Sequence, residues 1–209
     1  MDANWRDQVL SYIRAEAMPA DKFGHQPRLY NLAKQIAEDR DLILESNRAC
    51  DDDVLYASAW MHDLGVFLGH RPSDPAELQR WDHVPYTIRR SRELLAAWGF
   101  PPEKLDAAAE AIRTHQPGDQ AYLPEAIVLR DADILEQLGA VGALRAFAKV
   151  GRDTRYGTWS DVMPVLESAL ATLPGKLRLA KSRELAAKRI LALEAFLAAL
   201  RDEAGDQLF

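Results

Sequence analysis

Residues 51–65 read Asp-Asp-Asp-Val-Leu-Tyr-Ala-Ser-Ala-Trp-Met-His-Asp-Leu-Gly, and this stretch has the pattern of a buried helix that ends in polar residues. The three acids favour the start of a helix, because carboxylates interact well with the positive end of the helix dipole. An almost entirely apolar run follows and leads directly into His62 and Asp63, with Gly65 as a plausible C-terminal stop. Burying two such polar side chains without partners would cost several kcal/mol. We therefore expect a core helix whose last residues face a polar site.

The segments on either side repeat their apolar residues at helical spacing, and strand-like alternation is missing. This pattern predicts an all-α protein. The expected helices lie at 29–37, from about 77 to 98, over 105–112 with His115 at its end, from 124 through 147, near 161–173, and after Pro174-Gly175.

Composition limits the classes of function. The 209 residues are 48% hydrophobic, which is enough for a substantial core, and we expect one domain over 1–209 as a monomer or homodimer. A net charge of −6 disfavours binding of a nucleic-acid backbone. No stretch of 18 uncharged apolar residues and no signal-peptide layout occurs, so we expect a cytoplasmic protein that does not enter a membrane. The single cysteine, Cys50, excludes an intramolecular disulfide and a multi-cysteine zinc site.

The few histidines fall mostly at the ends of expected helices, where side chains can converge on a cleft. His25 precedes a helix, His62 and His115 close helices, and His83 lies near a helix start. The adjacent His62 and Asp63 offer a nitrogen and an oxygen donor on one segment. This pairing suits a divalent ion such as Mn²⁺, Fe²⁺, Co²⁺, Ni²⁺, Zn²⁺ or Mg²⁺.

Three stretches together resemble the HD-domain superfamily of metal-dependent phosphohydrolases. They are His25-Gln26-Pro27-Arg28-Leu29, Ala59-Trp60-Met61-His62-Asp63-Leu64-Gly65 and Leu129-Arg130-Asp131-Ala132-Asp133-Ile134-Leu135. The likeness covers roughly residues 20–150. It implies an HD-type helical bundle, here with an extra C-terminal helix pair at roughly 160–205.

The resemblance implies a set of site residues. His25, His62 and Asp63 would be metal ligands and Asp133 the fourth, with Asp131 as the alternative. These two acids lie about 200° apart around a helix, so both cannot face one ion. Asp131 would then support the site indirectly.

Two arginines are candidates for contact with a phosphate group. Arg28 lies one helical turn after His25, and Arg145 follows the terminal aspartate segment at a position where some relatives carry an arginine. The segment 131–140 looks like the subgroup that includes bacterial nucleotide pyrophosphohydrolases. Those relatives often have His-Asp before the first ligand, whereas this chain has Asp21-Lys22. The implied activity is hydrolysis of a phosphate ester or pyrophosphate bond of a small anionic substrate, such as a nucleotide, by a metal-activated water.

His83 and His115 leave alternatives open, since some HD proteins use two further histidines to hold a second metal. A two-metal site would suit a cyclic-nucleotide phosphodiesterase or, with iron, an oxygenase. Otherwise these histidines hydrogen-bond to phosphate, substrate or helix ends. A third alternative is a non-catalytic ligand-binding domain whose metal only holds helices together.

Overall fold

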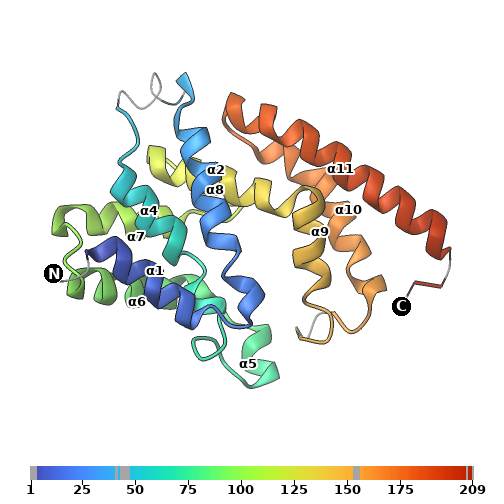
Figure 1. Ribbon diagram of the computed structural model, residues 1–209, viewed down its shortest axis with the longest axis horizontal. Coiled ribbons are helices and arrows are strands. Elements are labelled where there is room, and N and C mark those ends of the chain that lie inside the picture. The colour runs from blue at the N-terminus through green and yellow to red at the C-terminus, as the bar shows by residue number, and fades with distance from the viewer. Residues whose placement is uncertain (1–3, 41, 43–47, 153–155, 206, 209) are drawn as a thin grey trace. The chain divides into compact units, whose positions relative to one another are not determined.

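The computed structural model describes residues 4–40, 42, 48–152, 156–205 and 207–208, and all regular structure in these ranges is helical (Figure 1). The predicted all-α class is therefore confirmed. The chain divides into two compact units, Met1–Ala132 and Asp133–Phe209. The expectation of a single domain over the whole chain stays a prediction.

The helices of the first unit surround α4. They are α1 (Trp5–Glu16), α2 (His25–Ala37), α4 (Asp52–Met61), α5 (Pro75–Gln79), α6 (His83–Ala97), α7 (Leu105–Arg113) and the start of α8 (Pro124–Gln137), with short 3-10 helices η1 (Ala20–Lys22), η2 (Leu64–Val66) and η3 (Pro102–Lys104). Helices α1, α2, α6 and α7 all pack on α4. Every residue of α4 from Val54 to Met61 is buried, as expected of a helix that is apolar all round.

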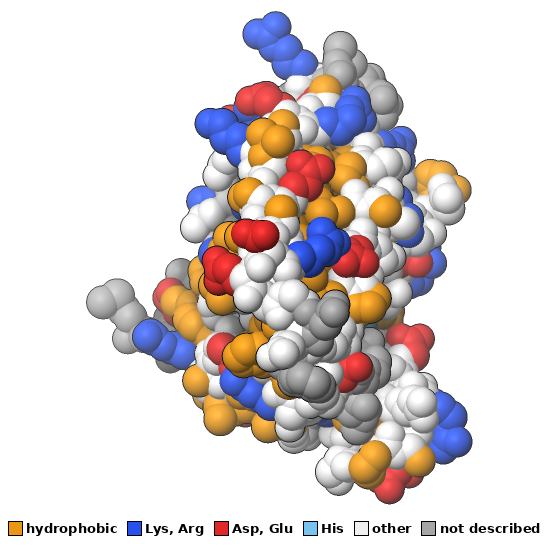
Figure 2. Space-filling view, turned by 90° about the vertical axis from the view of Figure 1, so that its right-hand side faces the viewer, with side chains coloured by type: hydrophobic (Ala, Val, Ile, Leu, Met, Phe, Trp, Pro, Cys, Tyr) orange, Lys and Arg blue, Asp and Glu red, His pale blue; other side chains and the backbone are white. Residues whose placement is uncertain are grey.

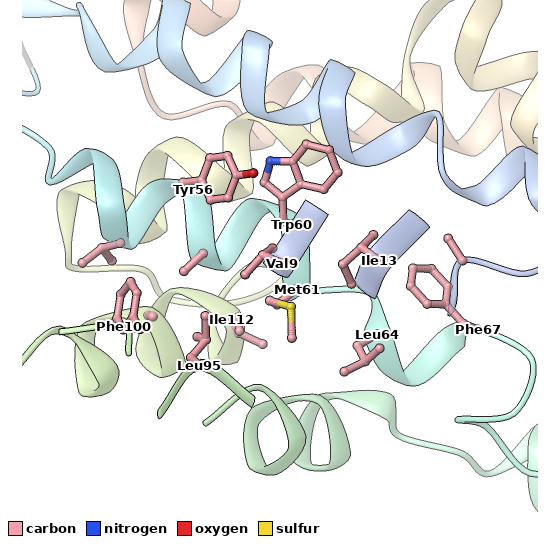
Figure 3. Close-up of a cluster of buried hydrophobic side chains, with 14 residues drawn as sticks. Val9, Ile13, Tyr56, Trp60, Met61, Leu64, Phe67, Leu95, Phe100 and Ile112 are labelled. Atoms are coloured by element: carbon pink, nitrogen blue, oxygen red, sulfur yellow. The ribbon is translucent and has the colours of Figure 1, made fainter. Parts of the chain in front are cut away.

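The core of the first unit joins residues far apart in the chain (Figure 3). Trp60 and Met61 of α4 pack with Ile13 of α1 and Ile112 of α7. The predicted core helix ending at His62 is thus confirmed, with Asp51 as its N-cap: the Asp51 carboxylate accepts hydrogen bonds from the Asp53 and Val54 amides. The core therefore holds fixed the end of the helix from which His62 and Asp63 project.

One predicted helix, from about 77 to 98, is wrong because the chain breaks between Gln79 and His83. Asp82 caps α6 by accepting a hydrogen bond from the Val84 amide, and the Trp81 indole N–H donates to the Gly65 carbonyl, 2.8 Å away. A tertiary hydrogen bond and a cap therefore override continuous helical periodicity. The break makes His83 the first residue of α6.

The second unit contains α9 (Gly139–Phe147), α10 (Met163–Thr172), α11 (Ala180–Ala204) and the short helices η4 (Trp159–Asp161) and η5 (Pro174–Lys176). The expected C-terminal helix pair is confirmed as α10 and α11. The single helix expected over 124–147 is wrong, since Gly139 has a φ of +84° and separates α8 from α9. A side chain there would also meet Arg189 of α11, which lies 3.2 Å from an ideal Cβ position.

The large hydrophobic side chains that the second unit exposes lie on different elements: Leu144 on α9, Trp159 on η4, Val165 on α10 and Leu191 on α11. On the face in Figure 2, hydrophobic side chains lie interspersed with acidic and basic ones. Among the described residues, no helix has the length and apolar character that crossing a membrane requires.

Candidate metal centre

Four histidines and one aspartate are placed by the ends of four helices. His25 is the first residue of α2, and His83 is the first residue of α6. His62 caps the C-terminus of α4, Asp63 follows it, and His115 comes two residues after the end of α7. The side chains thus belong to helices that the core of the first unit already packs together.

The first three predicted ligands form one group. The Nε2 atoms of His25 and His62 lie 3.3 Å apart. The Asp63 Oδ2 atom is 3.7 Å from His25 Nε2 and 3.6 Å from His62 Nε2. The structure therefore brings together residues 37 positions apart in the sequence, as the resemblance implied.

Asp63 also belongs to a second group, with His83 and His115. The ligand atoms of this group all lie within 4.8 Å of one another, and Asp63 Oδ1 is 4.0 Å from His83 Nε2. The imidazole rings make a series of edge contacts: the centroids of His62 and His115 are 5.1 Å apart, and those of His115 and His83 are 5.6 Å apart. Four of the five histidines of the chain meet in this way.

Backbone carbonyls orient two of the imidazoles. His62 Nδ1 lies 3.0 Å from the Ala59 carbonyl oxygen, and His115 Nδ1 lies 2.6 Å from that of Ile112. A carbonyl oxygen only accepts, so each Nδ1 carries the hydrogen and donates it. In the neutral ring the Nε2 atom then presents a lone pair, which is the arrangement that metal-binding histidines adopt.

The charge of Asp63 is stabilised within the cluster. Burial by itself raises the pKa of this carboxyl group, but the positive potential of His62, His25, Lys22 and His83 outweighs it and holds the pKa well below its usual range. Asp63 is therefore an ionised oxygen donor at neutral pH.

The donor set fits a divalent cation. Ligand atoms about 2.0–2.2 Å from one ion lie within roughly 4 Å of each other, and the three distances in the first group meet this condition. Two imidazole nitrogens and a carboxylate suit several first-row ions and Mg²⁺ with added water.

The two groups of ligand atoms include neither candidate for the fourth ligand, Asp131 or Asp133. Asp131 is fully buried, and one of its carboxylate oxygens is 3.5 Å from Arg130 Nη1. Asp133 is the first residue of the second unit, and its carboxylate accepts a hydrogen bond of 3.0 Å from Gln137 Nε2. Neither acid belongs to a described group of ligand atoms within 4.8 Å, so the preference for Asp133 stays a prediction.

The two arginines proposed for phosphate contact lie in different surroundings. Arg28 is exposed, and its guanidinium group folds back over Gly24, 2.9 Å from the ideal Cβ position there. Arg145 Nη1 donates to the Glu136 carbonyl at 3.2 Å and is 3.8 Å from the buried Glu136 carboxylate, within the second unit. Arg145 thus has a structural partner of its own.

Lys22 is a residue whose importance the sequence patterns did not show. Its charge contributes to the low pKa of Asp63, which places it in the electrostatic environment of the cluster. The available signal was its position three residues before His25, at the point where the chain departs from the pyrophosphohydrolase pattern.

His70 lies in the loop between η2 and α5, outside the cluster. Its Nε2 atom is 2.9 Å from the Glu16 carboxylate, and its Nδ1 atom is 2.8 Å from the Tyr86 hydroxyl group. These contacts connect the loop to α1 and α6. His70 therefore serves as a comparison for the four clustered histidines.

Comparison with known proteins identifies the family. A family model described as the HD domain matches residues 23–138, which is more than half of the chain. The chain belongs to the HD domain family. The matched range contains both groups of ligand atoms and both candidate aspartates of α8, so the resemblance to HD domains is confirmed, while the likeness to the pyrophosphohydrolase subgroup stays a prediction. No curated protein matches the chain significantly in sequence.

Several solved structures share the HD-domain fold. The chain is similar to Bacillus subtilis YpgQ in complex with ADP, with 22% identity, a TM-score of 0.66, and coverage of 96% of this chain and 98% of YpgQ. A predicted HD-superfamily hydrolase from an uncultured Thermotogales bacterium has 21% identity and a TM-score of 0.60, covering 95% and 92%. An HD-superfamily hydrolase from Bacillus thuringiensis has 15% identity and a TM-score of 0.64, covering 95% of each chain. At these identities the likeness shows the fold.

Proposed function

We propose that this HD-domain protein is a metal-dependent phosphohydrolase that cleaves a phosphate ester or pyrophosphate bond of a nucleotide. The observation that carries the proposal is the convergence of His25 Nε2, His62 Nε2 and Asp63 Oδ2 at 3.3–3.7 Å. These donors lie at the ends of α2 and α4 rather than within one helix. The neighbours named as HD-superfamily hydrolases support the same class of reaction.

The chemistry divides between the ion and the chain. A bound divalent ion would polarise a phosphoryl oxygen and lower the pKa of a coordinated water toward neutrality. The chain holds the donors in place: the Ala59 carbonyl fixes the ring orientation of His62, and Asp63 stays ionised. Phosphoryl transfer needs little covalent work from the protein, so positioning and charge stabilisation dominate.

Positive side chains beside the ligands support an anionic substrate. Lys22 adds to the positive potential at Asp63, and the exposed Arg28 lies one turn after His25 on α2. Guanidinium and ammonium groups bind phosphate oxygens through charge-assisted hydrogen bonds. The ADP complex of YpgQ, which has the same fold, supports a nucleotide as the substrate. Within the nucleotide class, the sequence of residues 131–140 favours a pyrophosphate bond.

The proposal is tested by assaying purified protein with Mn²⁺, Co²⁺, Ni²⁺ or Mg²⁺ against nucleoside triphosphates, nucleoside diphosphates and a generic phosphate monoester. His62→Ala and Asp63→Asn are expected to lower kcat/KM at least about 100-fold. His70→Gln is the matched control, because His70 is also hydrogen-bonded but lies outside both ligand groups. No turnover with any of the four ions, or equal turnover in His62→Ala and the wild type, would contradict the proposal.

A two-metal reaction is the second candidate, and the observation that favours it is that Asp63 belongs to both ligand groups. A carboxylate shared by two groups can bridge two ions, as phosphodiesterases and di-iron oxygenases require. Counting metal per chain by mass spectrometry separates the candidates. Two ions with hydrolysis of cyclic nucleotides would favour the phosphodiesterase, two irons with oxygen consumption the oxygenase, and one ion would exclude both.

A further inference from the structure

The turn after Asp63 is attached to residues 81–87, which include the start of α6, through both polar backbone groups of one residue, Gly65. The Gly65 amide donates to Thr87 Oγ1 at 3.0 Å, and the Gly65 carbonyl accepts from Trp81 Nε1 at 2.8 Å. Both side chains belong to the segment that begins α6, and Thr87 is fully buried. Backbone groups in a 3-10 turn are usually satisfied locally or by water, so two side-chain partners from one neighbouring segment make an unusually direct attachment.

The absence of a side chain at Gly65 allows this close approach. A Cβ atom there would lie 2.8 Å from the His83 carbonyl oxygen and 2.9 Å from Thr87 Oγ1, closer than real Cβ contacts, and 3.0 Å from His83 Cβ. The backbone of His83 therefore lies directly against the turn. This requirement explains Gly65 better than its expected role as a helix stop, because Gly65 does not have the positive φ that glycine stops usually adopt.

The attachment connects two members of the candidate metal centre. Asp63 lies two residues before Gly65, and His83 lies between Trp81 and Thr87. The two hydrogen bonds and the glycine contact thus fix the backbone positions from which Asp63 Oδ1 and His83 Nε2 approach to 4.0 Å. A shift of α6 along the turn would change this separation while leaving the distance between His25 and His62 unchanged, because neither of those residues is on α6.

We propose that Thr87 and Trp81 are positioning residues that hold His83 at the distance from Asp63 at which both can bind one cation. The inference rests on the second candidate under the proposed function, in which Asp63, His83 and His115 bind an ion, and extends it to residues that touch neither ion nor substrate. Partners of this kind orient metal ligands, and their loss weakens metal affinity about 10- to 100-fold.

The experiment measures Mn²⁺ binding by isothermal titration calorimetry and folding stability by urea denaturation in the presence of EDTA. His83→Ala defines the part of the Mn²⁺ affinity that depends on His83. Thr87→Val keeps the shape of the side chain but removes the hydroxyl group. We expect it to lower the Mn²⁺ affinity about tenfold, because His83 would no longer be held in place. Thr87→Ser restores the acceptor and is expected to restore the affinity.

Ser91 supplies a matched control on the same helix. It is buried one turn after Thr87, and its hydroxyl group has no hydrogen-bond partner among the described residues. Ser91→Ala therefore removes a buried hydroxyl group from α6 without touching the turn, and Mn²⁺ affinity is expected to stay within about twofold of the wild type. Trp81→Phe keeps an aromatic ring but removes the N–H group, so it tests the second hydrogen bond even if Thr87→Val does not fold.

Three results would overturn the inference: wild-type affinity in both Thr87→Val and Trp81→Phe, an equal loss in Ser91→Ala, or no loss in His83→Ala. The binding is measured without substrate. A chain that binds Mn²⁺ in the expected pattern but hydrolyses nothing would contradict the proposed function and leave the positioning role standing.

Discussion

The two ends of α4 both carry aspartates, but their partners differ in kind. At the N-terminal end, Asp53 pairs with Lys104 Nζ at 2.8 Å and Arg6 Nη2 at 2.5 Å. At the C-terminal end, Asp63 faces the Nε2 atoms of His25 and His62. Asp53 therefore faces lysine and arginine side chains at one end of α4, whereas Asp63 faces imidazole rings just after the other end.

Burial separates the two ends as well. The side chains of Asp53 and Arg6 are 30% and 31% exposed, whereas those of His25 and His62 are 3% and 1% exposed. A half-buried ion pair is already neutralised and is partly screened by solvent. Buried imidazoles beside an ionised carboxylate instead present several lone pairs to one point, which an added cation can satisfy. The comparison teaches that partner type and burial, more than acidic residues alone, distinguish a metal centre from a structural ion-pair network.

The largest expected effect contrasts matched acids at the two ends. Asp63→Asn should weaken Mn²⁺ binding at least about 100-fold, because an amide is a poorer donor and carries no charge, whereas Asp53→Asn should leave it unchanged. Calorimetric titration of both variants measures the difference. Equal losses in the two variants would mean that the contrast between the ends has no bearing on metal binding.

Gly65→Ala should disturb the C-terminal end through packing. The added methyl group would meet the His83 carbonyl at 2.8 Å, and such overpacking costs about 1–3 kcal/mol of the free energy of unfolding. Urea denaturation measures this loss. Gly118→Ala is the control, since a Cβ atom there meets nothing within 4 Å, and it should be close to neutral. A stability loss as large in Gly118→Ala would remove the role of the close approach.

Glu125→Gln should disturb the opposite end. Glu125 is fully buried and accepts hydrogen bonds from both Arg48 Nη atoms at 2.7 and 2.8 Å and from the Asp51 amide at 2.7 Å. Losing the charge should cost about 1.5 kcal/mol of unfolding free energy, since hydrogen bonds to charged groups are stronger than neutral ones. Mn²⁺ affinity should be unaffected. Glu103→Gln is the control, because Glu103 is an exposed acid of η3. If Glu125→Gln changed the unfolding free energy no more than this control, the Glu125 carboxylate would not anchor this end of α4.

The sequence predicts those parts of the site whose residues are adjacent in the chain. His62 and Asp63 follow an apolar run, so both the core helix and the polar site at its end can be read from adjacent positions. His25 was inferred from the resemblance, and the structure places it beside them. The match to the HD domain over residues 23–138 accounts for why this ordered pattern was informative.

The parts that could not be predicted depend on contacts between distant segments. The helix break before His83 comes from the hydrogen bond between Trp81 and Gly65, which helical periodicity does not register. Glu125 pairs with Arg48, 77 positions away, and this contact is visible only in the fold. Helix α1 was not singled out, although Asn4 caps it by accepting hydrogen bonds from two backbone amides.

The smallest expected effect is the pH dependence of the ion pairs at the N-terminal end. Hydrogen bonding to Lys104 is the main cause that lowers the pKa of Asp53 in the folded state. As the pH falls below about 4, the ordinary pKa of an aspartate, the unfolded chain therefore binds the proton more readily than the folded chain. The stabilisation by the ion pairs is thus present at neutral pH and is lost as the pH falls through the lowered pKa.

Asp53→Asn should cost about 0.5–1 kcal/mol of unfolding free energy at neutral pH. The difference from the wild type should shrink in acid and in about 1 M NaCl, where charges are screened. Urea denaturation across this pH range measures it. A difference that stays constant would mean that Asp53 acts through uncharged hydrogen bonds, and the contrast between the two ends of α4 would then rest on burial alone.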